Sequence, residues 1–294
     1  MKWETFTSLL EGFPDIERLH LQGLGEPMMH PRFFDMINYA AKRGIRVTIN
    51  TNLTLLNPER TERLIMSGLD MLYFSIDGST AETYERIRKR AHFERVLNNV
   101  EMLLETRKRL NSQLPHLSIV MVIMRQNLHE LPDLVRFAHR WSADRFFVQH
   151  LSHDFGEPTL PEEYRPMRDY ISEQSLAEED PERIERYFNE ARELAQSLGV
   201  NLRLPRTTPK RYEPGTPGRK RCDWPWTGAY ISYEGYMMPC CMVSTPDRMN
   251  FGKVTDHALT SVWNSSEYDK FREQLDSANP PDICRSCSLY WGTF

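Results

Sequence analysis

The amino-acid sequence predicts an α/β fold in which parallel strands alternate with helices, followed by a small cysteine-rich domain. Two observations predict it. Short β-rich runs alternate with amphipathic helical segments over the first half of the chain. All five cysteines lie after residue 221, in the last quarter. Strand–helix–strand alternation builds a parallel sheet with right-handed crossovers, so functional groups are expected at the carboxyl ends of the strands.

Five segments of the first half are expected to form the strands of this sheet. Each is a short apolar run with β-branched or aromatic residues. The predicted strands are residues 16–22, 46–50, 71–77, 117–124 and 145–151.

The helices between these strands have readable start and stop signals. Pro31 opens one helix that ends at Gly44. Asn57 and Pro58 provide an N-cap and a first-turn proline for a second helix that ends at Gly68. Two further helices are predicted from apolar side chains at helical spacing. These apolar positions are Val96, Leu97, Val100, Leu103 and Leu104 in one helix and Leu131, Leu134, Val135 and Ala138 in the other.

The sequence pattern divides the chain into three segments. Residues 1–155 carry the strand–helix alternation, residues 156–215 form a helical extension and linker, and residues 216–294 form the cysteine-rich domain. Within the extension, Asp180 and Pro181 begin a helix that Gly199 closes.

The composition is that of an ordinary water-soluble globular chain, with 40% hydrophobic residues, 27% charged residues and a formal net charge of −4. This charge gives no support for a nucleic-acid or membrane partner. No run approaches the roughly 18 apolar residues that span a bilayer. The N-terminus lacks the apolar core of a signal peptide, so a cytoplasmic location is expected. In that reducing compartment, and with an odd number of cysteines, metal ligation is a better interpretation of the thiols than disulfides.

Four cysteines form the strongest motif of the chain. Cys222, Cys240, Cys284 and Cys287 follow the spacing Cys-x17-Cys-x43-Cys-x2-Cys, and Gly235 stands five positions before the second. A Cys-x2-Cys turn points two sulfurs at one metal ion or cluster. A structural zinc ion and an iron–sulfur cluster are both consistent with these ligands, and the wide gaps favour the cluster. Cys241 is expected to be a buried small hydrophobe, with a role as ligand in place of Cys240 as the alternative.

Three short polar motifs follow the first three predicted strands. The first strand runs into Gly23-Leu24-Gly25-Glu26-Pro27, the second into Asn50-Thr51-Asn52-Leu53 and the third into Ser75-Ile76-Asp77-Gly78. A Gly-x-Gly after a strand also occurs in dinucleotide loops, but Met28 replaces the third glycine here. Each string alone is also typical of a helix cap or turn. Their occurrence at the ends of successive strands favours a shared ligand.

These motifs resemble those of the radical S-adenosylmethionine (radical SAM) superfamily, with Leu53 standing where glycine is usual. The resemblance implies that the strand ends bind S-adenosylmethionine, with a carboxylate accepting from the methionine ammonium. The residues implied are Gly25, Glu26, Pro27, Asn50, Asn52, Ser75 and Asp77.

The C-terminal cysteines, together with the sequences at residues 250–254 and 261–265, resemble the SPASM or twitch domain of the same superfamily. In that domain such cysteines hold an auxiliary [4Fe–4S] cluster, which makes Cys222, Cys240, Cys284 and Cys287 the implied ligands. The implied fold is an incomplete (β/α)6 radical SAM partial barrel followed by a SPASM-like domain.

The defining motif of the superfamily is missing from this sequence. Its members carry a Cys-x3-Cys-x2-Cys loop after the first barrel strand, whose cluster cleaves S-adenosylmethionine, whereas the first 221 residues here contain no cysteine. We therefore expect the chain as given to be unable to cleave the cofactor. A truncated N-terminus is the favoured explanation; a degenerate homologue and completion of the barrel by another chain are the alternatives.

In complete form the protein is expected to be an oxidoreductase-type radical enzyme that abstracts hydrogen from a small-molecule or peptide substrate, with flavodoxin or ferredoxin as reductant. Two other functions remain open. One is a non-catalytic [4Fe–4S] electron carrier or scaffold derived from this family. The other is a zinc-stabilised α/β binding protein.

Overall fold

The computed structural model describes residues 1–151, 155–207, 210, 212–213, 216, 222–256 and 258–292. The chain forms two compact units. The sheet unit comprises Asp15–Leu151 and Glu178–Thr207, and the cysteine unit comprises Met1–Pro14, Ser152–Ala177 and Thr208–Phe294. Most of the predicted linker lies outside the described residues. The predicted domain boundaries, after residues 155 and 215, stay a prediction.

Six parallel strands form the sheet of the sheet unit, in the same order as in the chain. All five predicted strands are confirmed within two residues at each end. The sixth strand has only two residues, too few to show a pattern in the sequence. Among the described residues the first and last strands do not pair, so the sheet is an open partial barrel. The strands are β1 (Arg18–Leu21), β2 (Arg46–Thr51), β3 (Met71–Ser75), β4 (His116–Ile123), β5 (Arg145–His150) and β6 (Leu202–Arg203).

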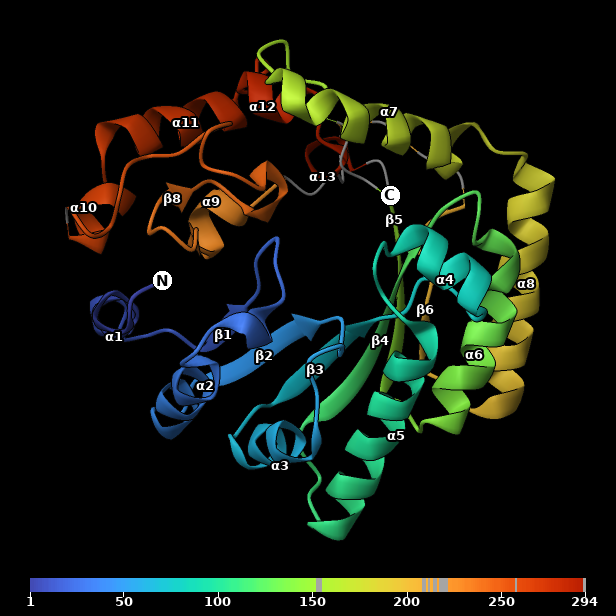
Figure 1. Ribbon diagram of the computed structural model, residues 1–294. Helices are drawn as coiled ribbons and strands as arrows, with labels where there is room; N and C mark the ends of the chain where they lie inside the picture. The colour runs from blue at the N-terminus through green and yellow to red at the C-terminus, as the bar shows by residue number, and fades with distance from the viewer. Residues whose placement is uncertain are drawn as a thin grey trace. The chain divides into compact units, whose positions relative to one another are not determined.

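Helices lie along one side of this sheet (Figure 1). The predicted caps form: Asn57 accepts a hydrogen bond from the Arg60 N–H, and Asp180 accepts from the Glu182 N–H. Gly199 ends its helix with a φ of +68°, a conformation that glycine adopts without strain. The helical segments of the unit are η1 (Pro27–Met29), α2 (Phe33–Lys42), α3 (Pro58–Met66), α4 (Ala81–Ile87), α5 (Phe93–Arg109), η2 (Leu128–Glu130), α6 (Leu131–Arg140) and α8 (Pro181–Leu198).

The two faces of the sheet differ in polarity. In β2, Val47 and Ile49 are fully buried, whereas Thr48 and Asn50 alternate with them and stay half-exposed. On the polar face, His20 of β1 contacts the Thr48 hydroxyl at 2.7 Å and also the Gln22 side chain. The surrounding protein desolvates the His20 ring and lowers its pKa, although these side-chain contacts oppose the shift. The polar face therefore presents neutral hydrogen-bonding groups.

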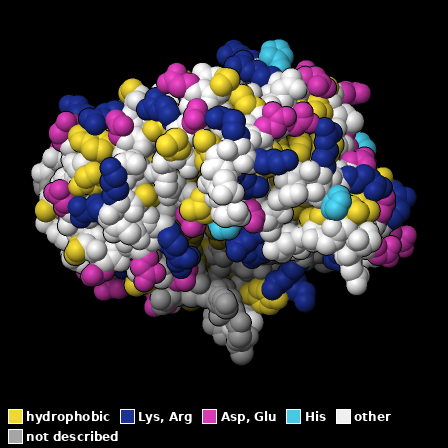
Figure 2. Space-filling view, turned by 90° about the horizontal axis from the view of Figure 1, so that it is seen from below, with side chains coloured by type: hydrophobic (Ala, Val, Ile, Leu, Met, Phe, Trp, Pro, Cys, Tyr) yellow, Lys and Arg dark blue, Asp and Glu magenta, His cyan; other side chains and the backbone are white. Residues whose placement is uncertain are grey.

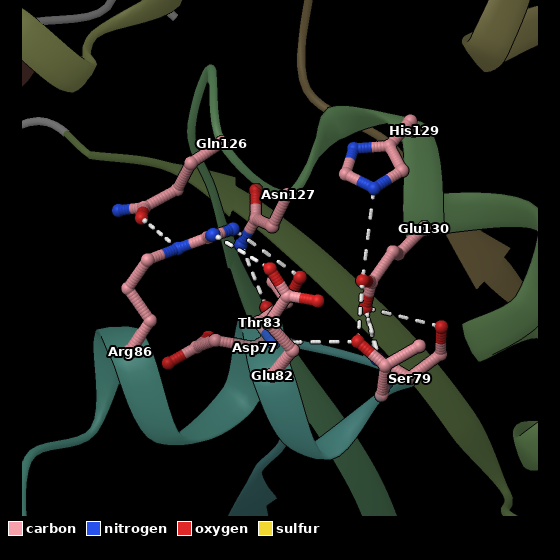
Figure 3. Close-up of polar contacts among 10 residues, drawn as sticks. Asp77, Ser79, Glu82, Thr83, Arg86, Gln126, Asn127, His129 and Glu130 are labelled. Atoms are coloured by element: carbon pink, nitrogen blue, oxygen red, sulfur yellow. Dashed lines mark hydrogen bonds and ion pairs between the residues drawn. The ribbon is translucent and has the colours of Figure 1, made fainter.

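The end of β3 is fastened to β4 by a buried carboxylate and an amide (Figure 3). Asp77, only 3% exposed, accepts from the Val122 N–H at 2.8 Å and pairs with Arg88 at 2.6 Å. Asn127 donates to the carbonyl oxygens of both Asp77 and Val122 at 2.9 Å. The Asp77 carboxylate and the Asn127 amide are therefore buried with hydrogen-bond partners, as buried polar groups usually are.

Glu130 at the end of η2 holds the start of α4 in the same region (Figure 3). Its carboxylate accepts hydrogen bonds from the backbone and hydroxyl groups of Ser79 and Thr80. Burial alone raises the pKa of Glu130, but the bonds from Thr83, Thr80 and Ser79 outweigh it, so the pKa lies below its usual value. The carboxylate is therefore charged in the folded protein at neutral pH.

The cysteine unit is built from short elements around an aromatic core. The buried core residues are Met237, Phe251, Leu259, Val262, Tyr268, Phe271, Leu275 and Tyr290. The helical segments are α1 (Trp3–Gly12), η3 (Glu162–Tyr164), α7 (Arg165–Gln174), η4 (Leu176–Glu178), α9 (Trp224–Thr227), η5 (Cys241–Val243), α10 (Leu259–Trp263), α11 (Ser266–Asp276), α12 (Asp282–Arg285) and α13 (Ser288–Trp291). An antiparallel pair of short strands, β7 (Tyr230–Ile231) and β8 (Met237–Met238), completes it.

Charged side chains of both signs are interspersed over the face shown in Figure 2. This distribution agrees with the small formal net charge of −4. Within the described ranges, no helix has both the length and the apolar composition to cross a membrane.

Two of the motif glycines of the sheet unit, Gly78 and Gly25, differ in their surroundings, which predicts different responses to substitution. A Cβ on Gly78 would lie 2.7 Å from the backbone nitrogen of Tyr84, whereas a Cβ on Gly25 would meet nothing within 4 Å. We expect Gly78→Ala to lower the free energy of unfolding by about 1–3 kcal/mol, since the α4 backbone must shift. Gly25→Ala serves as the matched control, with a change below about 0.5 kcal/mol. Urea unfolding followed by circular dichroism measures both; equal stabilities would contradict the close approach of α4 to Gly78.

Candidate metal centre and cofactor pocket

The four motif cysteines come from three separate stretches of the cysteine unit. Cys222 lies two residues before α9 and Cys240 two residues after β8. Cys284 belongs to α12, and Cys287 is the N-cap of α13. All five cysteines of the chain are described and half-buried, and none forms a disulfide.

The four thiols lie in one neighbourhood. Burial raises the pKa of Cys240 to about 12, with repulsion from Cys241 and Cys287 adding to the shift. Burial also raises the pKa of Cys284, and the charges of Cys287, Cys240 and Cys222 raise it further. Cys222, Cys284 and Cys287 also pack against the same hydrophobic core, which places three of the four thiols around one part of this unit.

The hairpin before Cys240 explains the spacing between Gly235 and that cysteine. Gly235 lies in the turn between β7 and β8 with a φ of +91°, and its N–H donates to Ser232 at 2.9 Å. A residue with a Cβ is strained at such a φ. The strand β8 then leads directly to Cys240. Gly235 therefore allows the tight turn after which β8 leads to Cys240.

The sequence elements that resemble the SPASM domain form the core behind the thiols. The N–H of Met237 donates to Gly252 at 3.0 Å, and Phe251 stacks on Tyr268 with ring centroids 4.0 Å apart. Arg272 lies 3.9 Å above the Tyr268 ring on α11. Cys222, Cys284 and Cys287 pack against this core.

The donor set fits a thiolate-bound metal centre in kind, since four cysteine thiols belong to one unit. Tyr268 is fully buried, and its hydroxyl has no hydrogen-bond partner among the described residues. Burial raises its pKa to about 12, and the charge of Cys240 adds to the shift. Tyr268 belongs to the core against which Cys222, Cys284 and Cys287 pack. A buried hydroxyl without a partner is costly, and thiolates that bind a metal would offer it an acceptor. Among the described residues, no group of three or more His, Cys, Asp or Glu side chains is arranged so that it could hold a metal ion.

Cys241 lies beside the same group of thiols. It begins η5, and burial raises its pKa, with repulsion from Cys222 adding to the shift. Cys241 is half-buried, as is Cys240. Cys240 thus stays the predicted ligand, with Cys241 as the alternative.

Glu26 joins the carboxyl ends of β1 and β2. Its side chain caps η1 by accepting from the Met28 N–H at 3.3 Å. The carboxylate also accepts from the Thr51 hydroxyl at 2.7 Å and from the Asn52 N–H at 2.8 Å. Because the side chain is half-exposed, the carboxylate keeps room for a further donor.

Two of the predicted pocket residues contact each other at the ends of β2 and β3. The Ser75 hydroxyl donates to the Asn50 side chain at 3.2 Å. Asn52 uses its Oδ1 to accept from the N–H and the hydroxyl of Thr54, which is a turn-forming role. The structure therefore brings Glu26 to Asn52 and Asn50 to Ser75.

The position after Asn52 shows why glycine is usual there. Leu53 has a φ of +60°, the left-handed region that costs about 1–2 kcal/mol for a residue with a Cβ. Its side chain is fully buried, and its carbonyl oxygen accepts from the Asn99 side chain at 2.8 Å. Burial and this hydrogen bond offset the strain.

The remaining pocket residues differ in exposure. Gly25 is exposed beside open space, and Pro27 begins η1. Asp77 is buried, and both of its carboxylate oxygens have protein partners in the junction between β3 and β4. A contact of any of these three residues to a cofactor stays a prediction.

Sequence analysis did not find Tyr268, Glu157 or Arg248. The apolar spacing of α11 indicates that Tyr268 is buried but does not indicate which thiol it approaches. Arg248 forms a buried ion pair with Glu157, which lies 91 residues earlier in the chain. No local pattern identifies a pair at such a separation.

Family models and related proteins agree with this geometry. The radical SAM superfamily model matches residues 9–138, and the model of the SPASM iron–sulfur cluster-binding domain matches residues 222–288. The cofactor-modifying protein of the tungsten-containing aldehyde ferredoxin oxidoreductase of Pyrococcus furiosus is 27% identical over 98% of this chain and 79% of its own length. The PqqA peptide cyclase of Rhizobium meliloti is 26% identical over 92% of this chain and 66% of its own length.

The fold also resembles that of a protein whose structure was solved with S-adenosylmethionine bound. SuiB of Streptococcus suis, crystallised with S-adenosylmethionine, has a TM-score of 0.65 at 16% identity, over 92% of this chain and 60% of its own. Its complex with the precursor peptide SuiA gives the same TM-score over 98% of this chain and 63% of its own. This chain therefore spans less than two thirds of SuiB. Both family models, one on the sheet and one on the cysteines, lead to one conclusion: the chain belongs to the radical SAM superfamily and carries a C-terminal SPASM domain.

Proposed function

We propose that Cys222, Cys240, Cys284 and Cys287 hold an auxiliary [4Fe–4S] cluster. The observation that carries this proposal is that three of these thiols, Cys222, Cys284 and Cys287, pack against one core, and that the pKa values of Cys240 and Cys284 are raised in part by neighbouring cysteines. Four thiolates are the usual ligands of such a cluster. When bound, the cluster would accept an electron or bind substrate. The Tyr268 hydroxyl would donate toward the thiolates, and the aromatic core would exclude water from them.

The sheet unit supplies the proposed pocket for S-adenosylmethionine. Glu26, anchored by β2, would accept a hydrogen bond from the methionine ammonium, and the open space beside Gly25 would admit it. The resemblance assigns Asn50, Asn52 and Ser75 to the same pocket. In this superfamily the cofactor is the source of the 5′-deoxyadenosyl radical that abstracts hydrogen from the substrate.

We further propose that the complete protein is an oxidoreductase-type enzyme acting on a peptide or a cofactor precursor. Two relatives support this substrate class: one is a peptide cyclase, and SuiB was crystallised with a precursor peptide. The Pyrococcus protein is named for modifying a cofactor. A cytoplasmic location and a flavodoxin or ferredoxin reductant belong to the same proposal.

A second candidate function is a non-catalytic iron–sulfur carrier or scaffold. The observation that favours it is that the four C-terminal thiols suffice to hold the auxiliary cluster without any further ligand. Without three further thiolates, this sequence alone offers no ligand set for the cluster that cleaves S-adenosylmethionine. A zinc-stabilised binding protein is the third candidate, since zinc also takes four thiolates.

Metal analysis of the anaerobically reconstituted chain separates the two iron–sulfur candidates from the zinc candidate. We expect about four irons and four sulfides per protomer, because four thiolates hold one [4Fe–4S] cluster. Cys284→Ala and Cys287→Ala should lose most of this iron. Cys241→Ala is the matched control and should keep it, whereas Cys240→Ala should not. About one zinc without sulfide would overturn the iron–sulfur proposal, and reversed results for Cys240 and Cys241 would exchange their roles.

The reduced, reconstituted 294-residue chain should form no 5′-deoxyadenosine from S-adenosylmethionine. All five of its cysteines lie after residue 221, which leaves no thiolates for the cleaving cluster. A form extended by a Cys-x3-Cys-x2-Cys loop from upstream sequence should restore the product, measured by liquid chromatography. Product from the unextended chain would contradict this prediction, and no product from the extended form would favour the carrier.

Glu26→Gln should weaken the binding of S-adenosylmethionine to the chain by about tenfold or more, because a charge-assisted hydrogen bond to the ammonium is lost. Equilibrium dialysis with the labelled cofactor measures the dissociation constant. Glu17→Gln is the matched control, since Glu17 is an exposed glutamate just before β1. Equal dissociation constants for the two variants would remove Glu26 from the pocket.

A further inference from the structure

A buried ion pair joins two distant segments of the cysteine unit. Arg248 and Glu157 have side chains that are 5% and 4% exposed. The Nε and Nη2 atoms of Arg248 both donate to Oε1 of Glu157. Two charges buried this deeply stabilise the fold only when they also satisfy other groups, so the remaining contacts of Arg248 show what the pair does.

Arg248 also holds the backbone just after Cys240. Its Nη1 donates to the carbonyl oxygen of Val243 at 2.9 Å, and the carbonyl oxygen of Met242 lies 3.5 Å away. The guanidinium lies 4.4 Å from the ring of Phe155, on the segment that carries Glu157. The pair therefore couples residues 155–157 to the turn that follows Cys240.

This turn has a strained conformation. Ser244 has φ and ψ of +69° and −54°, and the Thr245 N–H donates to the Val243 carbonyl oxygen at 2.8 Å. These values describe the rare γ-turn with positive φ. Such a conformation costs about 1–3 kcal/mol and persists only where the surroundings hold it. Arg248 stabilises the turn by its hydrogen bond to the Val243 carbonyl oxygen. Tyr164 also stabilises it, through a hydrogen bond between its hydroxyl and the Thr245 hydroxyl at 2.6 Å.

The same turn follows directly on a thiol. Cys240 is the N-cap of η5, and its side chain accepts no capping hydrogen bond from that segment. Arg248 donates to the carbonyl oxygens of Met242 and Val243, which are two and three residues after Cys240. The groups around a ligand sulfur and its exposure to solvent are among the factors that set a cluster's reduction potential.

We propose that Arg248, held by Glu157, is a positioning residue for the metal centre. It fixes the strained turn directly after Cys240, and through the position of this thiol it controls both the retention and the reduction potential of a cluster bound there. This inference rests on the proposed auxiliary cluster. Removing the Glu157 charge leaves an uncompensated buried guanidinium, which must move toward water and release the turn.

The test compares reconstituted Glu157→Gln and Arg248→Lys with a matched control, Glu162→Gln. Glu162 pairs with Arg165 in the same unit, but the side chains of that pair are 85% and 58% exposed. We expect iron release to a chelator to accelerate by about tenfold or more in Glu157→Gln, the usual effect of losing a group that orients a ligand. The midpoint potential and the electron paramagnetic resonance spectrum should also change. Arg248→Lys should fall between Glu157→Gln and the wild type, and Glu162→Gln should match the wild type.

Far-UV circular dichroism checks the fold of each variant. Folded variants with wild-type release rates, potentials and spectra would overturn the inference. If Glu157→Gln does not fold, the same measurements on Arg248→Lys test the inference. A wild-type chain that takes up no iron contradicts the proposed function instead. In that case alkylation of Cys240 in the apoprotein, mapped by mass spectrometry, tests the turn: faster labelling in the variants supports the inference, and equal labelling overturns it.

Discussion

Gathering four thiols in a partly buried place is the constraint on which the rest of the cysteine unit depends. Thiolates repel one another, and burial disfavours their charge, as the raised pKa values of Cys240 and Cys284 show. Such an arrangement persists only if other interactions determine the positions of the sulfurs. The stacked rings of Phe251 and Tyr268 and the hairpin at Gly235 supply these interactions. A bound metal would remove the repulsion, because it takes the thiols as charged ligands.

In the sheet unit, buried or half-buried carboxylates connect neighbouring segments of chain. Glu26, Asp77 and Glu130 all lie at the carboxyl ends of strands or in the loops beyond them. Each accepts hydrogen bonds from backbone N–H groups of a neighbouring segment. These bonds connect successive strand ends more tightly than side-chain packing alone. They also distinguish the three residues: Asp77 and Glu130 are buried in protein contacts, whereas Glu26 keeps an exposed side.

Much of the fold could be predicted from local patterns. The five strands are confirmed because each is a short apolar run with β-branched or aromatic residues. The helices at Asn57 and Asp180 are confirmed because a cap is a local hydrogen bond. The strand β6 was missed because two residues carry no period. The left-handed Leu53 was noticed in the sequence only as a departure from a motif, and its φ of +60° supplies the reason.

The sequence by itself determined the family, the order of the strands and the residue types of the site, because spacing and short motifs depend on neighbours along the chain. Only the tertiary structure decided which side chains meet. It placed Glu26 against Asn52, buried Asp77 beside Arg88, and directed Arg248 to both Glu157 and the turn after Cys240. Such pairs join residues far apart in the chain, and their energies depend on burial and direction, which no local pattern records.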